Sequence, residues 1–431
     1  MYRTIMEKLI AWKNSVYRKP LILEGERQTG KTYTLLQFGR EHYDNVAYFN
    51  FETNPQLCEV FSGDISADYL IALLSHAGGN TIVRERTLVI FDEIQICERA
   101  LTALKYFHEQ ASEYHIIAAG SLLGVAINRS HFSFPVGSVS MMHMHPMDYE
   151  EFILALGEDE LVREIKRCYR DMTAMAPILH QKALDRYRQY LAVGGMPECV
   201  KHFVSTSDYL LVRQTQEELL AGYRRDMGKY STKGEALKAA SVYENIVVQL
   251  SKVNTRFQYK LLKQGARAAL YEDAIQWLIL SGVIARVYRV EHLKIPLSNY
   301  IDIDAFKIYG SDVGLLGAMK RVLVTDLLYD SESLASFKGG LAENYVNSQL
   351  MARGHETFYW QSARSAEVDF IIHREGEIVP IEVKAADNTR SKSLSIFMDT
   401  YESAIGFKLG TKNFGKSGKV RTIPLYAAFC I

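Results

Sequence analysis

The sequence predicts a mixed α/β fold with an N-terminal parallel sheet, a central helical region and a smaller C-terminal α/β region. Three observations predict it. Short apolar runs alternate with helical patterns over residues 1–147, helical periodicity dominates residues 148–234, and strand patterns return after residue 282. The chain has 431 residues, which at ~150 residues per domain suggests about three domains.

A glycine-rich loop between the first predicted strand and the helix that follows is the strongest functional pattern. The loop reads Gly25-Glu-Arg-Gln-Thr-Gly30-Lys31-Thr32, between an apolar run at residues 20–24 and a helical pattern that starts at Tyr33. This pattern in this context predicts a phosphate-binding loop. Glycine lets backbone N–H groups turn inward around a triphosphate, and the helix N-terminus adds partial positive charge.

Residues of this loop have predicted roles in binding ATP and Mg²⁺. Lys31 is expected to reach the β and γ oxygens and to take part in catalysis, and the Thr32 hydroxyl is expected to ligate Mg²⁺. The residues expected to contact the nucleotide are Gly25, Gln28, Thr29, Gly30, Lys31 and Thr32, with Ser121 from a later strand.

An unbroken apolar run that ends in two carboxylates follows at residues 87–93, Thr-Leu-Val-Ile-Phe-Asp-Glu. It predicts a buried parallel strand with acids at its C-terminal edge, where ligands gather in open α/β sheets. Asp92 is expected to hold Mg²⁺ through its water shell, and Glu93 to orient and deprotonate the attacking water. The alternative is a core strand followed by a solvated acidic turn.

Two further runs complete the predicted sheet. Residues 115–121 form an apolar strand that ends at Ser121, and residues 46–52 form another that ends in an acid. Ser121 is a candidate sensor of the γ-phosphate, and the alternative is a hydroxyl that caps the next turn.

Composition and charge narrow the class of protein. Hydrophobic content of 48% and charged content of 23% are typical of globular proteins, and a formal net charge of zero requires any nucleic-acid surface to be local. Five scattered cysteines without a Cys-x-x-Cys pair favour reduced thiols in the cytoplasm. We see no signal peptide or uninterrupted membrane span. His143 and His145 lack further ligands nearby in sequence, so we interpret them as surface or turn residues rather than a metal site.

The middle of the chain is predicted to be helical, with one rigid interruption. A helical lid is expected over residues 148–234, and Gly194, Gly195 and Pro197 predict a tight elbow within it. Residues 235–320 then suggest a winged helix: helices at 239–250, 257–262 and 267–280, followed by strands at 283–288 and 306–309. The third helix carries Glu272 and Asp273, a poor complement to phosphate, so protein packing is favoured over DNA reading.

The last quarter contains a second set of acidic residues. Glu343 lies in a helical pattern, Asp369 in a strand, and Glu382 and Lys384 on one face of the next strand. Asp369 and Glu382 are expected to bind a divalent metal with Glu343 completing its shell, while Lys384 acts as a catalytic group in phosphodiester hydrolysis. The alternative is a surface strand of alternating charge. From Lys384 onward, eight Lys or Arg residues face three Asp or Glu residues, a surplus suited to a phosphate backbone or to solvent.

These motifs together resemble bacterial and archaeal P-loop ATPases of the AAA+ class. In that group an ATPase domain precedes a winged-helix segment and a C-terminal domain of unknown function that is similar to PD-(D/E)XK (restriction-endonuclease-like) nucleases. The resemblance spans nearly the whole chain and rests on residues 25–32, 88–93, 119–121, 194–198, 306–316 and 367–384. The division it implies is an ATPase domain at 1–147, a helical lid at 148–234, a winged helix at 235–320 and a nuclease-like domain at 321–431.

The resemblance implies ATP binding and hydrolysis, coupled to a nuclease-like domain that acts on DNA. The alternative is an ATP-dependent switch that binds a partner protein and uses the nuclease fold as an inactive scaffold. DNA and protein both remain candidate partners, no membrane partner is expected, and the oligomeric state is left open. One departure concerns a family arginine, since this chain has Ser138 after Gly137. Its loss implies slow hydrolysis or a role for another residue such as Arg129.

Overall fold

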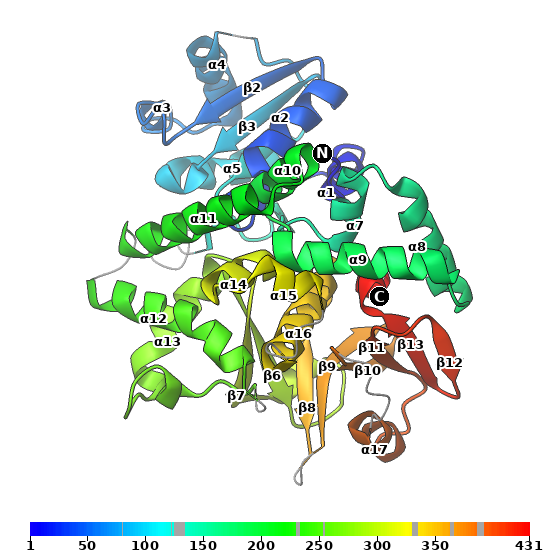
Figure 1. Ribbon diagram of the computed structural model, residues 1–431. Coiled ribbons are helices and arrows are strands. Elements are labelled where there is room, and N and C mark those ends of the chain that lie inside the picture. The colour runs from blue at the N-terminus through cyan, green and yellow to red at the C-terminus, as the bar shows by residue number, and fades with distance from the viewer. Residues whose placement is uncertain are drawn as a thin grey trace. The chain divides into compact units, whose positions relative to one another are not determined.

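The computed structural model describes residues 1–431 except 80, 122, 125–133, 230–232, 253–254, 330–334, 363–365 and 386–391. The chain forms two compact units (Figure 1). We call Tyr2–His145 with Leu280–Gly282 the N-terminal unit, and Pro146–Ile279 with Val283–Ile431 the C-terminal unit; Met1 groups with the latter. The four predicted domains remain predictions, and the last three of them fall in one compact unit.

The N-terminal unit is built on a five-stranded sheet in the order β2-β3-β4-β1-β5, with every pairing parallel. This confirms the predicted N-terminal parallel sheet. Its elements are α1 (Ile5–Lys13), β1 (Leu21–Glu24), α2 (Lys31–His42), β2 (Asn45–Asn50), α3 (Leu57–Val60), α4 (Ala67–Gly78), β3 (Thr87–Asp92), the 3₁₀ turn η1 (Ile94–Ile96), α5 (Glu98–Gln110), β4 (His115–Ala119) and β5 (Ser140–His143).

Alternate residues of these strands build separate hydrophobic clusters. Leu88 and Ile90 of β3 belong to a cluster with Leu35 of α2, whereas Val89 and Phe91 belong to another that includes residues of α4 and α5. Because successive side chains of a strand point to opposite faces, the clusters lie on opposite sides of the sheet. The strand is therefore fully buried, which explains its continuous apolar sequence.

Helices occupy the first part of the C-terminal unit, and a buried group of tyrosines packs between them. Tyr345 contacts Tyr149, Tyr187 and Tyr190 through edge-to-face ring contacts, the nearest with centroids 4.8 Å apart. The helices are α7 (Tyr149–Ala155), α8 (Asp159–Asp171), α9 (Pro177–Val193), α10 (Pro197–Thr206), α11 (Tyr209–Lys229), α12 (Lys233–Leu250), α13 (Ala268–Leu280), α14 (Val313–Met319), α15 (Val324–Leu328), α16 (Ala335–Ala352) and α17 (Lys392–Thr400).

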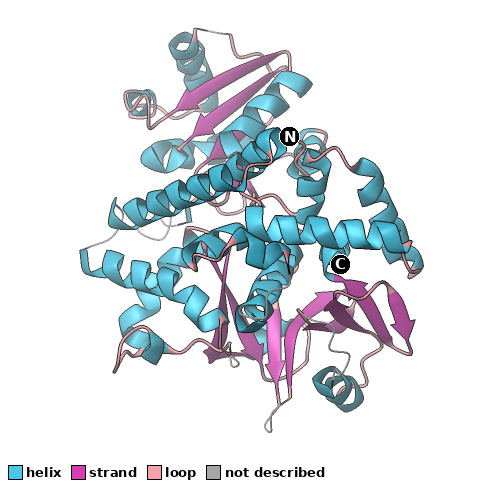
Figure 2. Ribbon diagram, in the orientation of Figure 1, coloured by secondary structure: helices cyan, strands magenta, loops and turns pink. Residues whose placement is uncertain are grey.

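An eight-stranded mixed sheet forms the rest of this unit, in the order β12-β13-β11-β10-β9-β8-β6-β7 (Figure 2). Its strands are β6 (Ile284–Val290), β7 (Ile301–Gly310), β8 (Phe358–Gln361), β9 (Glu367–Arg374), β10 (Glu377–Val383), β11 (Gly406–Gly410), β12 (Gly415–Ser417) and β13 (Val420–Pro424). The 3₁₀ segments are η2 (Tyr259–Leu261), η3 (Leu297–Tyr300) and η5 (Leu425–Cys430).

The β6–β7 hairpin, predicted as the wing of a winged helix, is part of this sheet. Tyr288 and Arg289 of β6 pair in parallel with Phe358 and Tyr359 of β8. The hairpin thereby extends the strands that carry the predicted nuclease-like residues. Residues 235–320 and 321–431 consequently share one sheet.

The short helix predicted at residues 257–262 is wrong, because only a 3₁₀ turn forms there, at Tyr259–Leu261. Phe257 is instead held against β7: its N–H donates to the carbonyl of Phe306 at 2.8 Å, and their rings stack 5.4 Å apart. The side-chain amide of Gln249 bonds both the N–H and the carbonyl of Gln258. These tertiary contacts replace the bonds that a helix would have made.

The glycine elbow ends α9 and permits a close backbone approach. Gly194 has φ of +77°, and the N–H of Gly195 donates to the Asp312 carboxylate at 2.5 Å. A Cβ on Gly195 would lie 2.0 Å from the carbonyl oxygen of Met147. Glycine is therefore required by contact with other parts of the C-terminal unit as well as by the turn itself.

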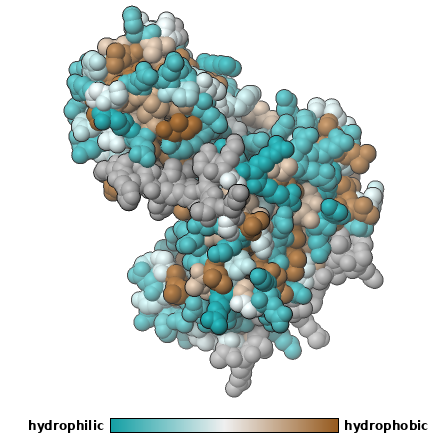
Figure 3. Space-filling model, turned by 90° about the vertical axis from the view of Figure 1, so that its left-hand side faces the viewer, coloured by the Kyte–Doolittle hydropathy of each residue, from teal (hydrophilic) through white to brown (hydrophobic). Residues whose placement is uncertain are grey.

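On the visible face, hydrophobic residues occur in groups interspersed among hydrophilic ones (Figure 3). Among the described residues, no helix combines the length and the apolar character needed to cross a bilayer.

Gly195→Ala is expected to destabilise the C-terminal unit by about 2 kcal/mol or more, because the new methyl group overlaps a backbone carbonyl. Gly222→Ala is the matched control, since Gly222 lies inside α11 with nothing within 4 Å of an added Cβ. It should raise stability by up to about 1 kcal/mol through helix propensity. Urea unfolding measures both changes, and equal stability of the Gly195 variant and the wild type would contradict the packing argument.

Candidate functional sites

The loop between β1 and α2 has the backbone geometry of a phosphate cradle. Gly25, Gln28 and Gly30 have φ of +139°, +63° and +87°. These left-handed conformations turn the chain tightly before α2 begins at Lys31. The Thr29 hydroxyl donates to the carbonyl of Glu26 at 2.9 Å, and the Thr29 carbonyl accepts from Arg3 at 2.7 Å. The loop is thus braced from inside and by the segment before α1.

Lys31 is buried and folds back onto its own loop. Its Nζ donates to the carbonyl oxygens of Gly25 at 2.9 Å and Glu26 at 2.7 Å. Burial lowers the pKa of Lys31 to about 8, against the raising effect of the carboxylates of Glu26, Glu93 and Asp92. The ammonium already lies at the cradle and is partly desolvated, so it is placed to exchange carbonyl oxygens for phosphate oxygens.

Thr32 and Asp92 are brought together as the sequence predicts. The Thr32 hydroxyl donates to Oδ2 of Asp92 at 2.8 Å, and the Tyr48 hydroxyl donates to the same oxygen at 2.8 Å. A hydroxyl and a carboxylate at this separation are the hard oxygen donors that Mg²⁺ takes alongside waters and phosphates. The donor set therefore fits the expected ion. Tyr48, on the neighbouring strand β2, was not predicted from the sequence.

Glu93 immediately follows β3 in a left-handed conformation, with φ of +52°. Its carboxylate accepts from the Gln95 amide at 2.5 Å, and its N–H donates to Asp92 at 3.0 Å. Burial raises the pKa of Glu93, and the neighbouring charge of Asp92 adds to the increase. A half-buried carboxylate with a raised pKa is suited to accept a proton from water. Gln95, which sets its orientation, was also missed by sequence reasoning.

Ser121 follows the end of β4 and reaches the phosphate loop through Arg27. The Nε of Arg27 donates to the Ser121 hydroxyl at 3.2 Å. Ser121 is buried, and its contact with the nucleotide stays a prediction. Ser138 is also buried, and Arg129 lies outside the described residues.

The C-terminal acidic residues lie around Lys307, a lysine that the sequence analysis did not predict to be part of the site. Lys307 of β7 is 1% exposed, and its ammonium contacts Glu367 at 2.6 Å and Glu343 at 3.4 Å. Burial alone would lower the pKa of Lys307, but the charges of Glu343, Glu367 and Asp369 raise it. Lys307 thus carries a fixed positive charge where a metal was expected. Its strand lies outside the sequence region that contains the acids, which explains why it was missed.

Asp369 is partly buried beside this group. Its Oδ2 accepts from the N–H of Val383 at 2.7 Å. Burial raises the pKa of Asp369 to about 8, and the charge of Glu343 adds to this increase. Tyr309 donates its hydroxyl to Glu343 at 2.9 Å.

Glu382 and Lys384 point to the same side, as predicted, and pair with each other at 2.7 Å. The other oxygen of Glu382 accepts from the N–H of Leu394 in α17 at 3.0 Å. Both oxygens of Glu382 are therefore engaged within the protein. Lys307 likewise contacts Glu343, so the metal ligation predicted for Glu343, Asp369 and Glu382 stays a prediction.

Family comparisons agree with the N-terminal site. Residues 17–153 match the profile of the AAA domain. Residues 184–326 and 338–428 match two domains of unknown function, DUF8612 and DUF4143. Over residues 17–153 the N-terminal unit is accordingly similar to AAA domains. No curated protein matches the chain.

Several solved structures are similar at low identity. The Walker-type ATPase PABY2304 of Pyrococcus abyssi is 13% identical, covers 73% of this chain and 94% of its own, and has a TM-score of 0.44. The ORC2 protein of Aeropyrum pernix, in ADPNP and ADP complexes, is 14% identical over 76% and 95%, with a TM-score of 0.36. AMPPCP-bound DnaA of Aquifex aeolicus is 12% identical over 64% and 86%, with a TM-score of 0.28. All three TM-scores are below 0.5.

Lys307→Met is expected to lower the free energy of unfolding of the C-terminal unit by about 3 kcal/mol or more, because it leaves two neighbouring carboxylates without their counter-charge. Lys201→Met, at an exposed position of α10, is the control and should change stability by less than about 1 kcal/mol. Urea unfolding at neutral pH measures both. A Lys307 variant as stable as the wild type would mean that the ammonium does not hold these acids together.

Proposed function

We propose that the N-terminal unit binds Mg·ATP and hydrolyses it, as an ATPase of the AAA+ class. The observation that carries this proposal is the contact between Thr32 and Asp92 at 2.8 Å, with Lys31 in the adjacent loop. The C-terminal edge of a parallel sheet brings together the phosphate loop, the Lys31 ammonium and the side-chain oxygens of Thr32 and Asp92. This combination supports nucleotide binding more specifically than any one motif.

The loop residues bind the phosphates by exchanging existing contacts. The loop N–H groups of Gly25, Gln28, Thr29 and Gly30 donate hydrogen bonds to the phosphate oxygens. Lys31 Nζ moves from two carbonyl oxygens to the β and γ phosphates. Thr32 and Asp92 would hold Mg²⁺, which neutralises charge on the phosphates when bound. Because Lys31 is already largely desolvated before the ligand binds, the free-energy cost of removing water from its ammonium on binding is smaller.

Glu93 supplies the proton acceptor for hydrolysis in this proposal. Its carboxylate orients the attacking water, and the hydrogen bond from Gln95 fixes which oxygen faces it. Ser121 is proposed to sense the γ-phosphate through Arg27. Ser138 stands where the resembling family has an arginine. We propose that Arg129, or an arginine of a neighbouring copy, takes that role.

For the C-terminal unit we favour a scaffold or partner-binding role over nuclease activity. The ion pairs of Lys307 with Glu343 and Glu367 support it, because a lysine neutralises acids that a metal would otherwise need. In this view ATP binding switches affinity for a protein partner. The second candidate is metal-dependent cleavage of DNA by Asp369, Glu382 and Lys384, favoured by the Glu382–Lys384 geometry. We propose a cytoplasmic location, supported by the five free cysteines.

Lys31→Ala should weaken ATP binding at least about 100-fold, because the loop loses its ammonium. Glu93→Gln should bind ATP normally and lose turnover, since an amide does not accept the proton. Calorimetry with Mg·ATP and phosphate release measure the two effects. Lys105→Ala, at an exposed position of α5, is the control. Unchanged affinity of the Lys31 variant would show that the loop has been misassigned.

The two roles of the C-terminal unit are separated by nuclease assays with Mg²⁺ or Mn²⁺. The scaffold role predicts no cleavage of single- or double-stranded DNA by the full-length protein with ATP. Cleavage abolished by Asp369→Ala and by Lys384→Ala would overturn it in favour of the nuclease. Cleavage that survives both substitutions would point to a contaminant or another site.

A further inference from the structure

Two acidic and two histidine residues face one another where β1 and β5 end. In the parallel pairing of these strands, Glu24 of β1 lies opposite His143 of β5. Glu26 and His145 each lie two residues further along, and the intervening Met144 is buried in the core on the other side. Alternation along extended chain therefore brings the four side chains to one face.

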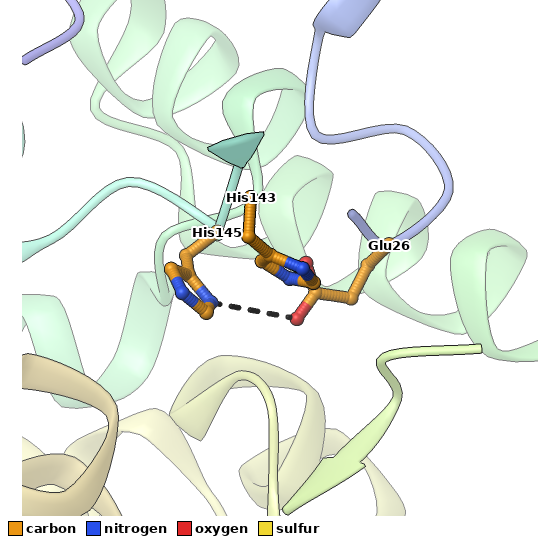
Figure 4. A group of neighbouring side chains, drawn as sticks. All are labelled: Glu26, His143 and His145. Carbon is orange, nitrogen blue, oxygen red and sulfur yellow. Dashed lines mark ion pairs between the residues drawn. The ribbon is translucent and has the colours of Figure 1, made fainter. Parts of the chain in front are cut away.

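Glu26 occupies the centre of this group, and each of its oxygens faces a different histidine (Figure 4). Oε2 lies 3.5 Å from Nε2 of His143, and Oε1 lies 3.9 Å from Nδ1 of His145. The Glu26 side chain is 3% exposed, and its Oε2 is buried without a hydrogen-bond donor. A buried carboxylate oxygen in that condition is a costly arrangement unless a cation is near.

The separations suit a small metal ion. One ligand atom from each of Glu26, His143 and His145 can be chosen so that all three lie within 4.8 Å of one another. Tetrahedral Zn²⁺ with bonds of about 2.0–2.1 Å would place neighbouring ligand atoms about 3.4 Å apart. The two histidine–carboxylate distances are within about 0.5 Å of that value. They involve different oxygens of Glu26, so side-chain rotation would bring both imidazoles to one oxygen.

Glu24 adds a feature typical of metal-binding histidines. Its carboxylate lies 3.6 Å from Nδ1 of His143, the ring nitrogen that does not face Glu26. Histidine ligands commonly donate their second N–H to a carboxylate, which fixes the tautomer and orients the ring. The side chains of His143 and His145 are 33% and 23% exposed, so an ion and a fourth, solvent ligand have access.

We propose that Glu26, His143 and His145 form a zinc site beside the phosphate loop, with Glu24 as a positioning residue. Two imidazoles and one carboxylate form a ligand set that favours Zn²⁺ over Mg²⁺. The site is distinct from Thr32 and Asp92 and does not depend on the proposed ATPase activity. Among the described residues it is the only group of three that meets the ligand-distance criterion above.

The ion would tie the end of β5 to the first turn of the loop. The carbonyl of Glu26 accepts from both Lys31 Nζ and the Thr29 hydroxyl, so the backbone that the ion immobilises also holds these two groups. Zinc binding therefore links the position of β5 to the shape of the nucleotide cradle.

The test is a Co²⁺ titration of untagged, full-length protein stripped with EDTA, without nucleotide. We expect one Co²⁺ per chain, an intense visible absorption band of four-coordinate cobalt, and loss of that band on adding equimolar Zn²⁺. Glu26→Gln, His143→Ala and His145→Ala should each weaken binding at least about 100-fold, and Glu24→Gln about 10-fold. His76→Ala, exposed on α4, should bind as the wild type does.

The proposal would be overturned if the band is absent, or if both histidine substitutions leave Co²⁺ binding unchanged. Glu26, His143 and His145 would then form only ion pairs with one another. Circular dichroism in EDTA identifies variants that fail to fold. If the histidine variants do not fold, Glu26→Gln, which preserves side-chain volume, provides the test of the zinc site. Lys31→Ala should keep the cobalt band while losing ATP. The zinc site and the nucleotide site can therefore fail separately.

Discussion

The pairing of β1 with β4 on one side and β5 on the other determines where the phosphate loop, Ser121 and His143 lie relative to one another. All three strands run parallel and end at one edge, and the phosphate loop begins where β1 stops. Ser121 follows β4, and His143 ends β5. A register shift of one residue would turn these side chains to the opposite face. Apolar strands buried on both sides make such a shift costly, so the core fixes the chemistry of its edge.

In the C-terminal unit, several carboxylates lie close together and are partly or fully shielded from water. A single ammonium from β7 joins Glu343 of α16 to Glu367 of β9, and Tyr309 of the same strand adds a hydrogen bond. Removing charges from water is costly unless partners surround them. The arrangement keeps strand, helix and hairpin in a single geometry, whatever the unit binds.

Local patterns predicted which side chains of the N-terminal unit come together, because these residues lie close to strand ends. The Thr32–Asp92 contact and the position of Glu93 agree with the order of motifs along the chain. Lys307 and Glu26 were missed for a common reason, because their partners lie on elements that are distant in the sequence. The histidine pair looked incomplete for the same reason, since Glu26 lies 117 residues before His143. Gln95 was missed although its partner Glu93 lies only two residues before it. At residues 257–262, contacts with β7 outweighed local helix propensity.

The shared sheet of the C-terminal unit means that its two families of unknown function are not separable bodies. The match to DUF8612 ends after β7, and the match to DUF4143 begins within α16, yet β6 hydrogen-bonds directly to β8. A polypeptide beginning at residue 338 would present the bare edge of β8 to solvent, with backbone amides and carbonyls free to recruit any extended chain. Evolution could therefore have recombined these segments only as a pair, or with a substitute strand ready to cover that edge.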